Sequence, residues 1–188
     1  MLKQDLHIHT IFSVGDSAVV PEQTPQFIAS LKHAEITGIS DHLEYLVNGE
    51  FEQYKETLEK LGLHVGVEVN GYDWIERAKT VNVEYYIFHC QDRDEDYEGL
   101  GILLNTGKPV IVAHPQVFTT NLNRVPAECY LEINNRYVWR YDWQTRLAPY
   151  VDKFRFIMSS DAHQPNWLNQ TVSRYVSQQL QVKESIIF

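Results

Sequence analysis

The sequence predicts an α/β fold built on a parallel sheet. Short apolar runs alternate with stretches of helical spacing along the whole chain, and residues of metal-binding type gather where the apolar runs end. The chain has 188 residues, of which 44% are hydrophobic and 22% are charged. Since that length suits one sizeable core and no linker divides the chain, we expect residues 1–188 to form a single domain.

Seven apolar runs have the length and composition of strands. They cover residues 2–9, 36–40, 63–69, 84–89, 109–114, 130–134 and 154–160. Helical spacing is found at 21–32, 51–61, 72–79, 97–105, 141–150 and 166–181. The first helical stretch opens with Pro21, which suits a helix start, and the second stops at Gly62. The alternation favours either an open doubly wound sheet or a small, closed or distorted (β/α) barrel. No glycine-rich loop follows the first run, which argues against a dinucleotide-binding fold.

The bulk composition excludes several classes of protein. The net charge of −9 disfavours binding of long nucleic acids, whose backbone is also negative, but it leaves a small phosphorylated substrate open. No apolar stretch approaches the length of a membrane span, and the first residues lack the pattern of a secretory signal. Cys90 and Cys129 are too few for a disulfide framework. We therefore expect a cytoplasmic protein without a membrane partner, and the sequence leaves its oligomeric state open.

Six of the eight histidines stand at or just beyond the C-terminal end of a predicted strand: His7, His9, His42, His89, His114 and His163. This is the end where the loops of a (β/α) barrel converge on an active site. His33 and His64 fall elsewhere, and we expect them to be surface or structural histidines.

The spacing within the strands strengthens this pattern. Because residues i and i+2 of a strand point the same way, His7 and His9 should face one cavity. Asp161 and His163 repeat the arrangement on the last strand, and Glu132 and Asn134 do so on the sixth. Glu68 is a carboxylate in an otherwise apolar strand, where it would need a partner or a metal ion. Imidazole and carboxylate ligands suit zinc, manganese or iron, and the number of candidates predicts two or three metals.

The ordered motifs resemble the PHP (polymerase and histidinol phosphatase) family. They cover nearly the whole chain and read Asp5-Leu6-His7-Ile8-His9-Thr10, Ser40-Asp41-His42, Gly66-Val67-Glu68, His89, Ala113-His114-Pro115 and Ser160-Asp161-Ala162-His163. The resemblance implies a distorted seven-stranded (β/α)7 TIM-like barrel with three divalent metal ions (Zn, Mn or Fe). The residues of three motifs, those around His42, Glu68 and Asp161, are most similar to the histidinol-phosphatase-like branch of the family.

The resemblance also implies a set of ligands for each metal. The first set is His7, His9, Glu68 and Asp161; the second is Glu68, His89 and His114; the third is Asp16, His42 and His163. Glu68 would bridge the first two metals. Asp16 belongs to a loop, 13–16, whose spacing departs from the family pattern. Asp41 is expected to support the site instead of ligating, since its side chain points away from that of His42.

The activity implied by the resemblance is hydrolysis of a small, histidinol-phosphate-like phosphomonoester through attack of a metal-bridging hydroxide. The catalytic assignments are Glu68 as the bridge, Asp16 as a candidate general acid and Arg136 as the cation that binds the phosphate. Three alternatives stay open: an amidohydrolase-type enzyme acting on an amide or lactone, a PHP nuclease acting on short oligonucleotides, and a silent binding module that keeps the fold.

Overall fold

A computed structural model describes all residues, 1–188, and contains one seven-stranded parallel sheet in the order β1-β2-β3-β4-β5-β6-β7. The strands are β1 (Leu2–Asp5), β2 (Ala34–Ile39), β3 (His64–Val69), β4 (Tyr85–Phe88), β5 (Val110–Val112), β6 (Tyr130–Asn134) and β7 (Arg155–Ser159). All seven predicted strands are therefore present and follow one another around the sheet in chain order.

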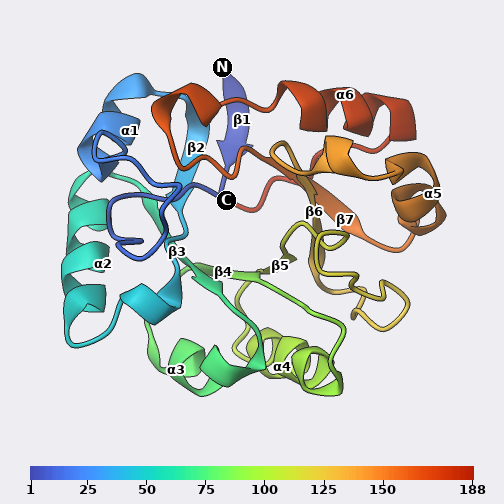
Figure 1. The fold of residues 1–188 in the computed structure, drawn as a ribbon, viewed down its shortest axis with the longest axis horizontal. Coiled ribbons are helices and arrows are strands. Elements are labelled where there is room, and N and C mark those ends of the chain that lie inside the picture. The colour runs from blue at the N-terminus through green and yellow to red at the C-terminus, as the bar shows by residue number, and fades with distance from the viewer.

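The sheet curls into a nearly closed barrel, and the helices form a ring outside it (Figure 1). The α-helices are α1 (Pro25–Leu31), α2 (Glu50–Lys60), α3 (Ile75–Thr80), α4 (Asp94–Leu104), α5 (Trp143–Leu147) and α6 (Thr171–Leu180). The predicted distorted seven-stranded (β/α) barrel is confirmed, and the open doubly wound sheet is not the fold. No α-helix lies between β5 and β6, which are joined by turns.

Closure of the barrel takes place beyond the ends of the outer strands. Ile8 forms a parallel bridge with Ala162, and the amide of His9 donates to the carbonyl of Ala162 at 2.9 Å. β1 itself ends at Asp5, although the apolar pattern predicts a strand through residue 9. Residues 6–9 make only this one bridge. Leu6 and Ile8 pack in the two apolar cores, and His7 and His9 belong to the cluster at the barrel mouth.

The first helix also begins later than its sequence pattern predicts. Pro21 and Glu22 form a turn, and α1 starts at Pro25, behind the N-cap residue Thr24. The side chain of Thr24 accepts a hydrogen bond from the amide of Phe27 at 3.1 Å. A proline does open the helix, but it is Pro25 and not Pro21. The reason is that Thr24, just before Pro25, caps the N-terminus of the helix.

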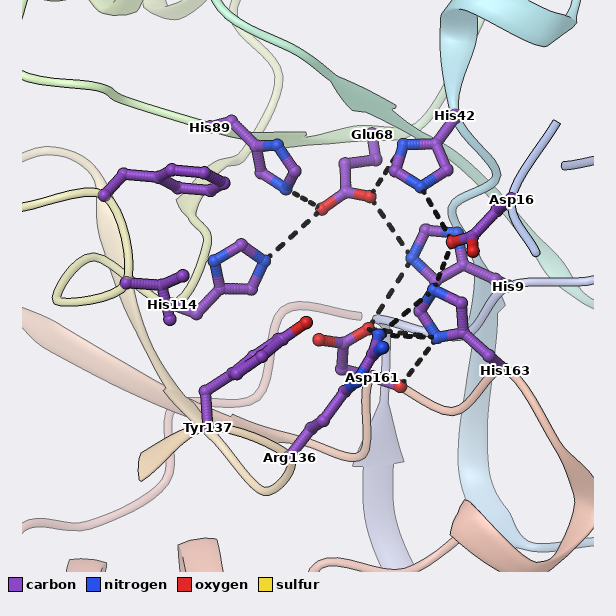
Figure 2. Close-up of a pocket in the computed structure, with 12 residues that line it drawn as sticks. His9, Asp16, His42, Glu68, His89, His114, Arg136, Tyr137, Asp161 and His163 are labelled. Atoms are coloured by element: carbon purple, nitrogen blue, oxygen red, sulfur yellow. Dashed lines mark hydrogen bonds and ion pairs between the residues drawn. The ribbon is translucent and has the colours of Figure 1, made fainter. Parts of the chain in front are cut away.

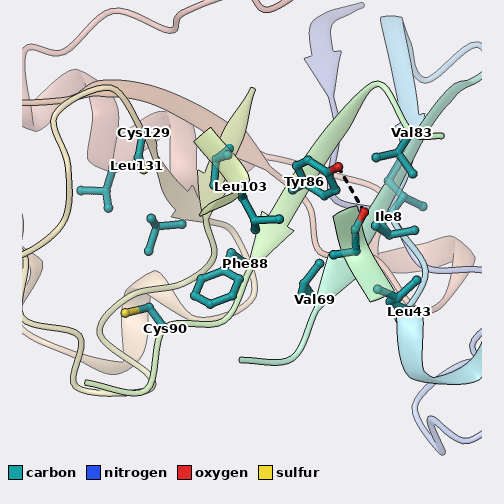
Figure 3. Packing of buried hydrophobic residues seen from close by; sticks show 14 of the residues in the cluster. Ile8, Leu43, Val69, Val83, Tyr86, Phe88, Cys90, Leu103, Cys129 and Leu131 are labelled. Atoms are coloured by element: carbon teal, nitrogen blue, oxygen red, sulfur yellow. Dashed lines mark hydrogen bonds between the residues drawn. The ribbon is translucent and has the colours of Figure 1, made fainter. Parts of the chain in front are cut away.

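Two layers of apolar side chains support the barrel. The larger core fills the space between strands and helices and includes Val69, Phe88 and Leu131 (Figure 3). The smaller one lies inside the barrel and consists of Leu6, Tyr85, Ile87, Ile111, Ala113 and Ile157. Since strand residues alternate between these two layers, the inward positions nearer the C-terminal ends of the strands remain for polar residues.

The opposite end of the barrel is covered by the last residues described. The side chain of Gln4 donates to the carbonyl of Ser185 at 2.5 Å and accepts from the amide of Ile187 at 3.2 Å. Ile187 packs on the inner apolar core. No helix of the structure combines the length and the apolar character needed to cross a membrane.

Candidate metal centre

A polar cavity of about 280 Å³ opens at the C-terminal end of the barrel strands. Nine of its twelve lining residues are polar or charged, and eight of those nine are predicted metal ligands. The lining comprises His9, Asp16, His42, Glu68, His89, His114, Val117, Phe118, Arg136, Tyr137, Asp161 and His163 (Figure 2). The ninth predicted ligand, His7, is fully buried beside the cavity, so the structure brings the whole predicted set together.

Glu68 lies at the centre of the cluster. Its carboxylate oxygens are 3.1 Å from Nε2 of His7, 3.2 Å from Nε2 of His9 and 3.1 Å from Nδ1 of His42. Nε2 of His89 also contacts this carboxylate, and Nε2 of His114 is 3.7 Å away. Five imidazoles from the ends of four strands, β1, β2, β4 and β5, therefore converge on one carboxylate that is 1% exposed. Figure 2 shows four of them: His9, His42, His89 and His114.

The local backbone explains why these side chains meet. His7 and His9 flank Ile8, and their two Nε2 atoms are 3.1 Å apart, as two residues on one side of an extended segment should be. Two other candidate ligands at strand ends have left-handed backbones, His114 at φ 22° and Asp161 at φ 52°. Such conformations are costly for residues other than glycine and concentrate at functional sites.

The charges of this cluster depend on one another. Burial alone would raise the pKa of Glu68, but the charges of His89, His42 and His7 hold it well below its usual range. Burial would lower the pKa of His42, yet the nearby carboxylate of Glu68 and the hydrogen bond with Asp16 raise it to about 9. For His9, burial and the neighbouring charge of His163 lower the pKa well below its usual value. The cluster thus contains an ionised carboxylate among imidazoles of unequal basicity.

A second group of ligands lies on the side of the cavity formed by the loop after β1. The Asp16 carboxylate is 2.8 Å from Nε2 of His163 and 3.5 Å from Nε2 of His42, and it also accepts from the amide of Ala18 at 2.7 Å. Burial would raise the pKa of Asp16, but the hydrogen bonds with His163 and His42 lower it well below its usual range. An ionised carboxylate suits a metal ligand better than a proton donor, so this geometry favours the first of the two roles assigned to Asp16.

Asp41 supports the same loop from outside the cavity. It accepts hydrogen bonds from the amide and the hydroxyl of Thr10 and from the hydroxyl of Ser13, each at 2.6 Å. Burial outweighs these bonds and raises its pKa to about 6. Asp41 does not line the cavity, in agreement with the supporting position expected for it.

Arg136 is at the cavity wall, where the sequence places a phosphate-binding cation. One of its terminal nitrogens, Nη1, is 3.2 Å from Nδ1 of His163 and 3.7 Å from an oxygen of Asp161. Arg93, which follows β4, and Arg124, between β5 and β6, are paired with Asp96 and Asp94 and do not line the cavity.

The two histidines expected to be structural have partners away from the cluster. Nε2 of His33 lies 2.8 Å from Asp5, and Nδ1 of His64 lies 2.9 Å from Glu84. Neither lines the cavity. Position relative to the strand ends was therefore sufficient to separate the clustered histidines from the others.

Glu132 is the site residue whose role the sequence left unassigned. Its carboxylate is 2.6 Å from Nδ1 of His7, accepts from the amide of His114 at 2.6 Å, and contacts the Ser159 hydroxyl. Burial would raise the pKa of Glu132, but the charge of His7 lowers it to about 2. The cavity also has two aromatic walls, Phe118 and Tyr137, in irregular segments with no periodic pattern. Phe118 was missed, and the aromatic-rich segment that begins at Tyr137 suggests core packing in preference to a pocket wall.

The donor set fits divalent metal ions. Several buried atoms form no hydrogen bond: Nδ1 of His114, Oε1 of Glu68, and Nε2 of His89 and Nδ1 of His42, which approach the Glu68 carboxylate without hydrogen-bond geometry. Such atoms are costly unless something binds them. The side chains form three groups, and within each group the potential ligand atoms lie within 4.8 Å of one another. The groups are His9, His42 and His163; His7, Glu68 and His114; and His7, His9 and Asp161. These clusters could hold metal ions, and their nitrogen and carboxylate donors are those that zinc, manganese and iron accept.

A scan of the chain against models of protein families finds no match, and no curated protein matches it with significant similarity.

Proposed function

We propose that the chain is a metal-dependent phosphoesterase that hydrolyses a small phosphomonoester. The observation that carries the proposal is the buried carboxylate of Glu68, with the ring nitrogens of His7, His9 and His42 all within 3.2 Å of it. A carboxylate ringed by imidazoles at the mouth of a barrel is the arrangement expected of a bridging metal ligand.

The proposed centre takes three divalent cations. His7, His9, Glu68 and Asp161 would hold the first; Glu68, His89 and His114 the second; and Asp16, His42 and His163 the third. Zinc, manganese and iron are the candidates, since six of the nine ligands are imidazoles. The motifs that resemble the PHP family support a centre of three metal ions, and the residues within those motifs support the histidinol-phosphatase-like branch.

When bound, such ions lower the pKa of a water molecule and neutralise charge on phosphate oxygens. The protein's own groups would do the rest. The guanidinium of Arg136 is fixed at the cavity wall by His163 and Asp161 and would bind a non-bridging phosphate oxygen. The ring of Tyr137 lies edge-on to His114, with ring centres 5.0 Å apart, and would limit how far a phosphate can move along the wall.

The shape of the cavity supports a small substrate. Its volume of about 280 Å³ is just below the usual range for small-molecule sites, and only three of its twelve lining residues are hydrophobic. Three of the lining residues are carboxylates, which would repel a long polyphosphate chain in the absence of bound cations. A small phosphorylated molecule is therefore the proposed partner, in preference to a long nucleic acid.

A substrate panel tests the proposal. The purified chain would be loaded with Mn²⁺, Zn²⁺ or Fe²⁺ and offered phosphomonoesters, phosphodiesters and short oligonucleotides, and lactones and amides. We expect phosphate release from monoesters, loss of that activity in His9→Ala, and normal activity in the control His64→Ala. No phosphate release with any metal would overturn the proposal. Turnover of lactones or amides alone would indicate an amidohydrolase, and turnover of diesters or oligonucleotides alone would indicate a nuclease.

A further inference from the structure

A column of alternating arginine and aromatic side chains leads from the cavity to the protein surface. The guanidinium of Arg136 is 4.9 Å from the ring centre of Trp167 and 4.9 Å from that of Tyr137. The guanidinium of Arg140 is 4.8 Å from the same Tyr137 ring and 5.2 Å from the ring of Trp139. Because Tyr137 lines the cavity, Arg140 is attached to the outside of a cavity wall.

Arg140 is one of four among the eight arginines of this chain that form no ion pair. Arg93, Arg124 and Arg174 each have a carboxylate oxygen within 3.0 Å. Arg140 is exposed and forms no ion pair, in a chain with 25 acidic residues. Its N–H groups are therefore free to bind an anion from solution.

The aromatic neighbours give this free guanidinium a fixed position. Trp139 is 62% exposed, and its indole N–H donates to the carbonyl of Arg136 at 2.9 Å, which anchors the ring. Rings beside a guanidinium hold it by cation–π contact and leave the N–H groups at its edge available. An arginine held in this way loses less side-chain entropy when it binds a carboxylate or phosphate.

We propose that Tyr137, Trp139 and Arg140 form a leaving-group subsite that binds a second anionic group of the substrate. The inference rests on the proposed phosphoesterase function. It specifies a phosphomonoester whose leaving group carries a carboxylate or another phosphate. The scissile phosphate would lie by Arg136, and the second anion would bind Arg140 across the Tyr137 ring. A leaving group with an ammonium, as in a histidinol-like substrate, would be repelled by Arg140.

A matched series of substrates tests the subsite. Alkyl phosphates with chains of three to six carbons would carry hydrogen, ammonium, carboxylate or phosphate at the far end. With the metal-loaded wild type we expect KM to be about tenfold lower for the anionic members than for the neutral ones. Arg140→Gln should remove this preference and leave kcat and the KM of the neutral members within about twofold. Arg140→Lys should keep part of the preference, because it keeps the charge but loses the planar fork.

The control variant is Arg146→Gln, which removes another exposed arginine that forms no ion pair and does not line the cavity. It should leave the preference intact. The corresponding alkylphosphonates, which cannot be hydrolysed, would be titrated calorimetrically into the same metal-loaded proteins. Their binding tests the subsite even if the wild type releases no phosphate. Equal affinity for anionic and neutral phosphonates in the wild type, or an unchanged preference in Arg140→Gln, would overturn the proposal. A preference for phosphate over carboxylate would identify which anion the subsite binds.

Discussion

The carboxylate of Glu132 lies 2.6 Å from Nδ1 of His7, while Nε2 of the same ring faces Glu68 at 3.1 Å. An acceptor at Nδ1 places the ring proton there and turns the lone pair of Nε2 toward the cluster, as is usual for a metal-binding histidine. Glu132 thus orients the proposed metal ligand His7 without reaching the cavity itself.

Replacement of Glu132 by Gln should therefore weaken metal binding. The amide can no longer provide an anionic acceptor to His7, and loss of such partners reduces metal affinity about 10–100-fold. Titration of the metal-free protein with Zn²⁺ or Mn²⁺ would measure the change. Glu84→Gln is the matched control, because Glu84 lies 2.9 Å from Nδ1 of His64, outside the cluster. Equal effects of the two variants would contradict this role for Glu132.

Gly15 should be required for the third metal. A Cβ at this position would overlap the ring of Tyr45, which packs over the loop that carries Asp16 and lies edge-on to His42 with ring centres 5.8 Å apart. Gly15→Ala must therefore displace the ring or the loop. We expect it to reduce the number of bound metals by one per chain, as measured by elemental analysis.

Two comparisons make the Gly15 test specific. Addition of Tyr45→Ala removes the overlapping ring, so the double variant should bind metal no worse than Tyr45→Ala alone. Gly101→Ala is the control, since nothing lies within 4 Å of the added carbon in α4, and alanine should stabilise that helix by up to about 1 kcal/mol. An unchanged metal count in Gly15→Ala would disprove the requirement.

Metal uptake should release protons and strengthen as the pH rises. In the metal-free chain the pKa of His42 is raised to about 9, since Glu68 and Asp16 outweigh its burial. Below that pH the ring is protonated, whereas a metal binds only the neutral form, so protons and metal compete. Metal affinity should therefore increase from pH 6 to about 9. Calorimetry in buffers of different ionisation enthalpy would count the protons.

His42→Asn serves as the comparison for the proton count. It should release about one proton fewer per chain at pH 7.5 and show a shallower dependence of metal affinity on pH. The same slope in wild type and variant would mean that His42 does not exchange its proton for a metal.

Asp41 should contribute mainly to stability. Asp41→Asn replaces two acceptor oxygens by one oxygen and one donor, although the side chain accepts three hydrogen bonds from Thr10 and Ser13. We expect a loss of about 1–3 kcal/mol in the free energy of unfolding, measured with urea on the metal-free protein. Asp73→Asn, at an exposed residue 3.9 Å from Arg93, should change stability little. A similar result for both variants would contradict this expectation.

Much of the fold and most of the candidate site could be predicted from the sequence, because both follow from short-range patterns. Alternation of apolar runs and helical stretches gave the seven strands, and spacing of two residues gave the shared direction of His7 and His9. The closure of the barrel could not be predicted from such short-range patterns. It depends on Ile8 pairing with Ala162, and an open sheet would have the same local pattern.

The remaining features depend on partners that are distant in the chain. Glu132 has the spacing of a strand residue that faces inward, but its partner His7 lies 125 residues earlier. Phe118 and Tyr137 belong to turns, where no periodicity tells which way a side chain points. The late start of α1 was missed for a different reason: Pro21 and Pro25 are both suited to a helix start, and only Pro25 follows a capping residue, Thr24.

The most direct measurement is the position of the metals themselves. Crystals of the chain grown with Mn²⁺ would be measured for anomalous scattering. We expect three peaks in the cavity: one by His7, His9, Glu68 and Asp161, one by Glu68, His89 and His114, and one by Asp16, His42 and His163. Glu68→Ala should lose at least one of the two peaks that share this carboxylate. A map without anomalous peaks among these side chains, from protein that has kept its fold, would contradict a trinuclear centre.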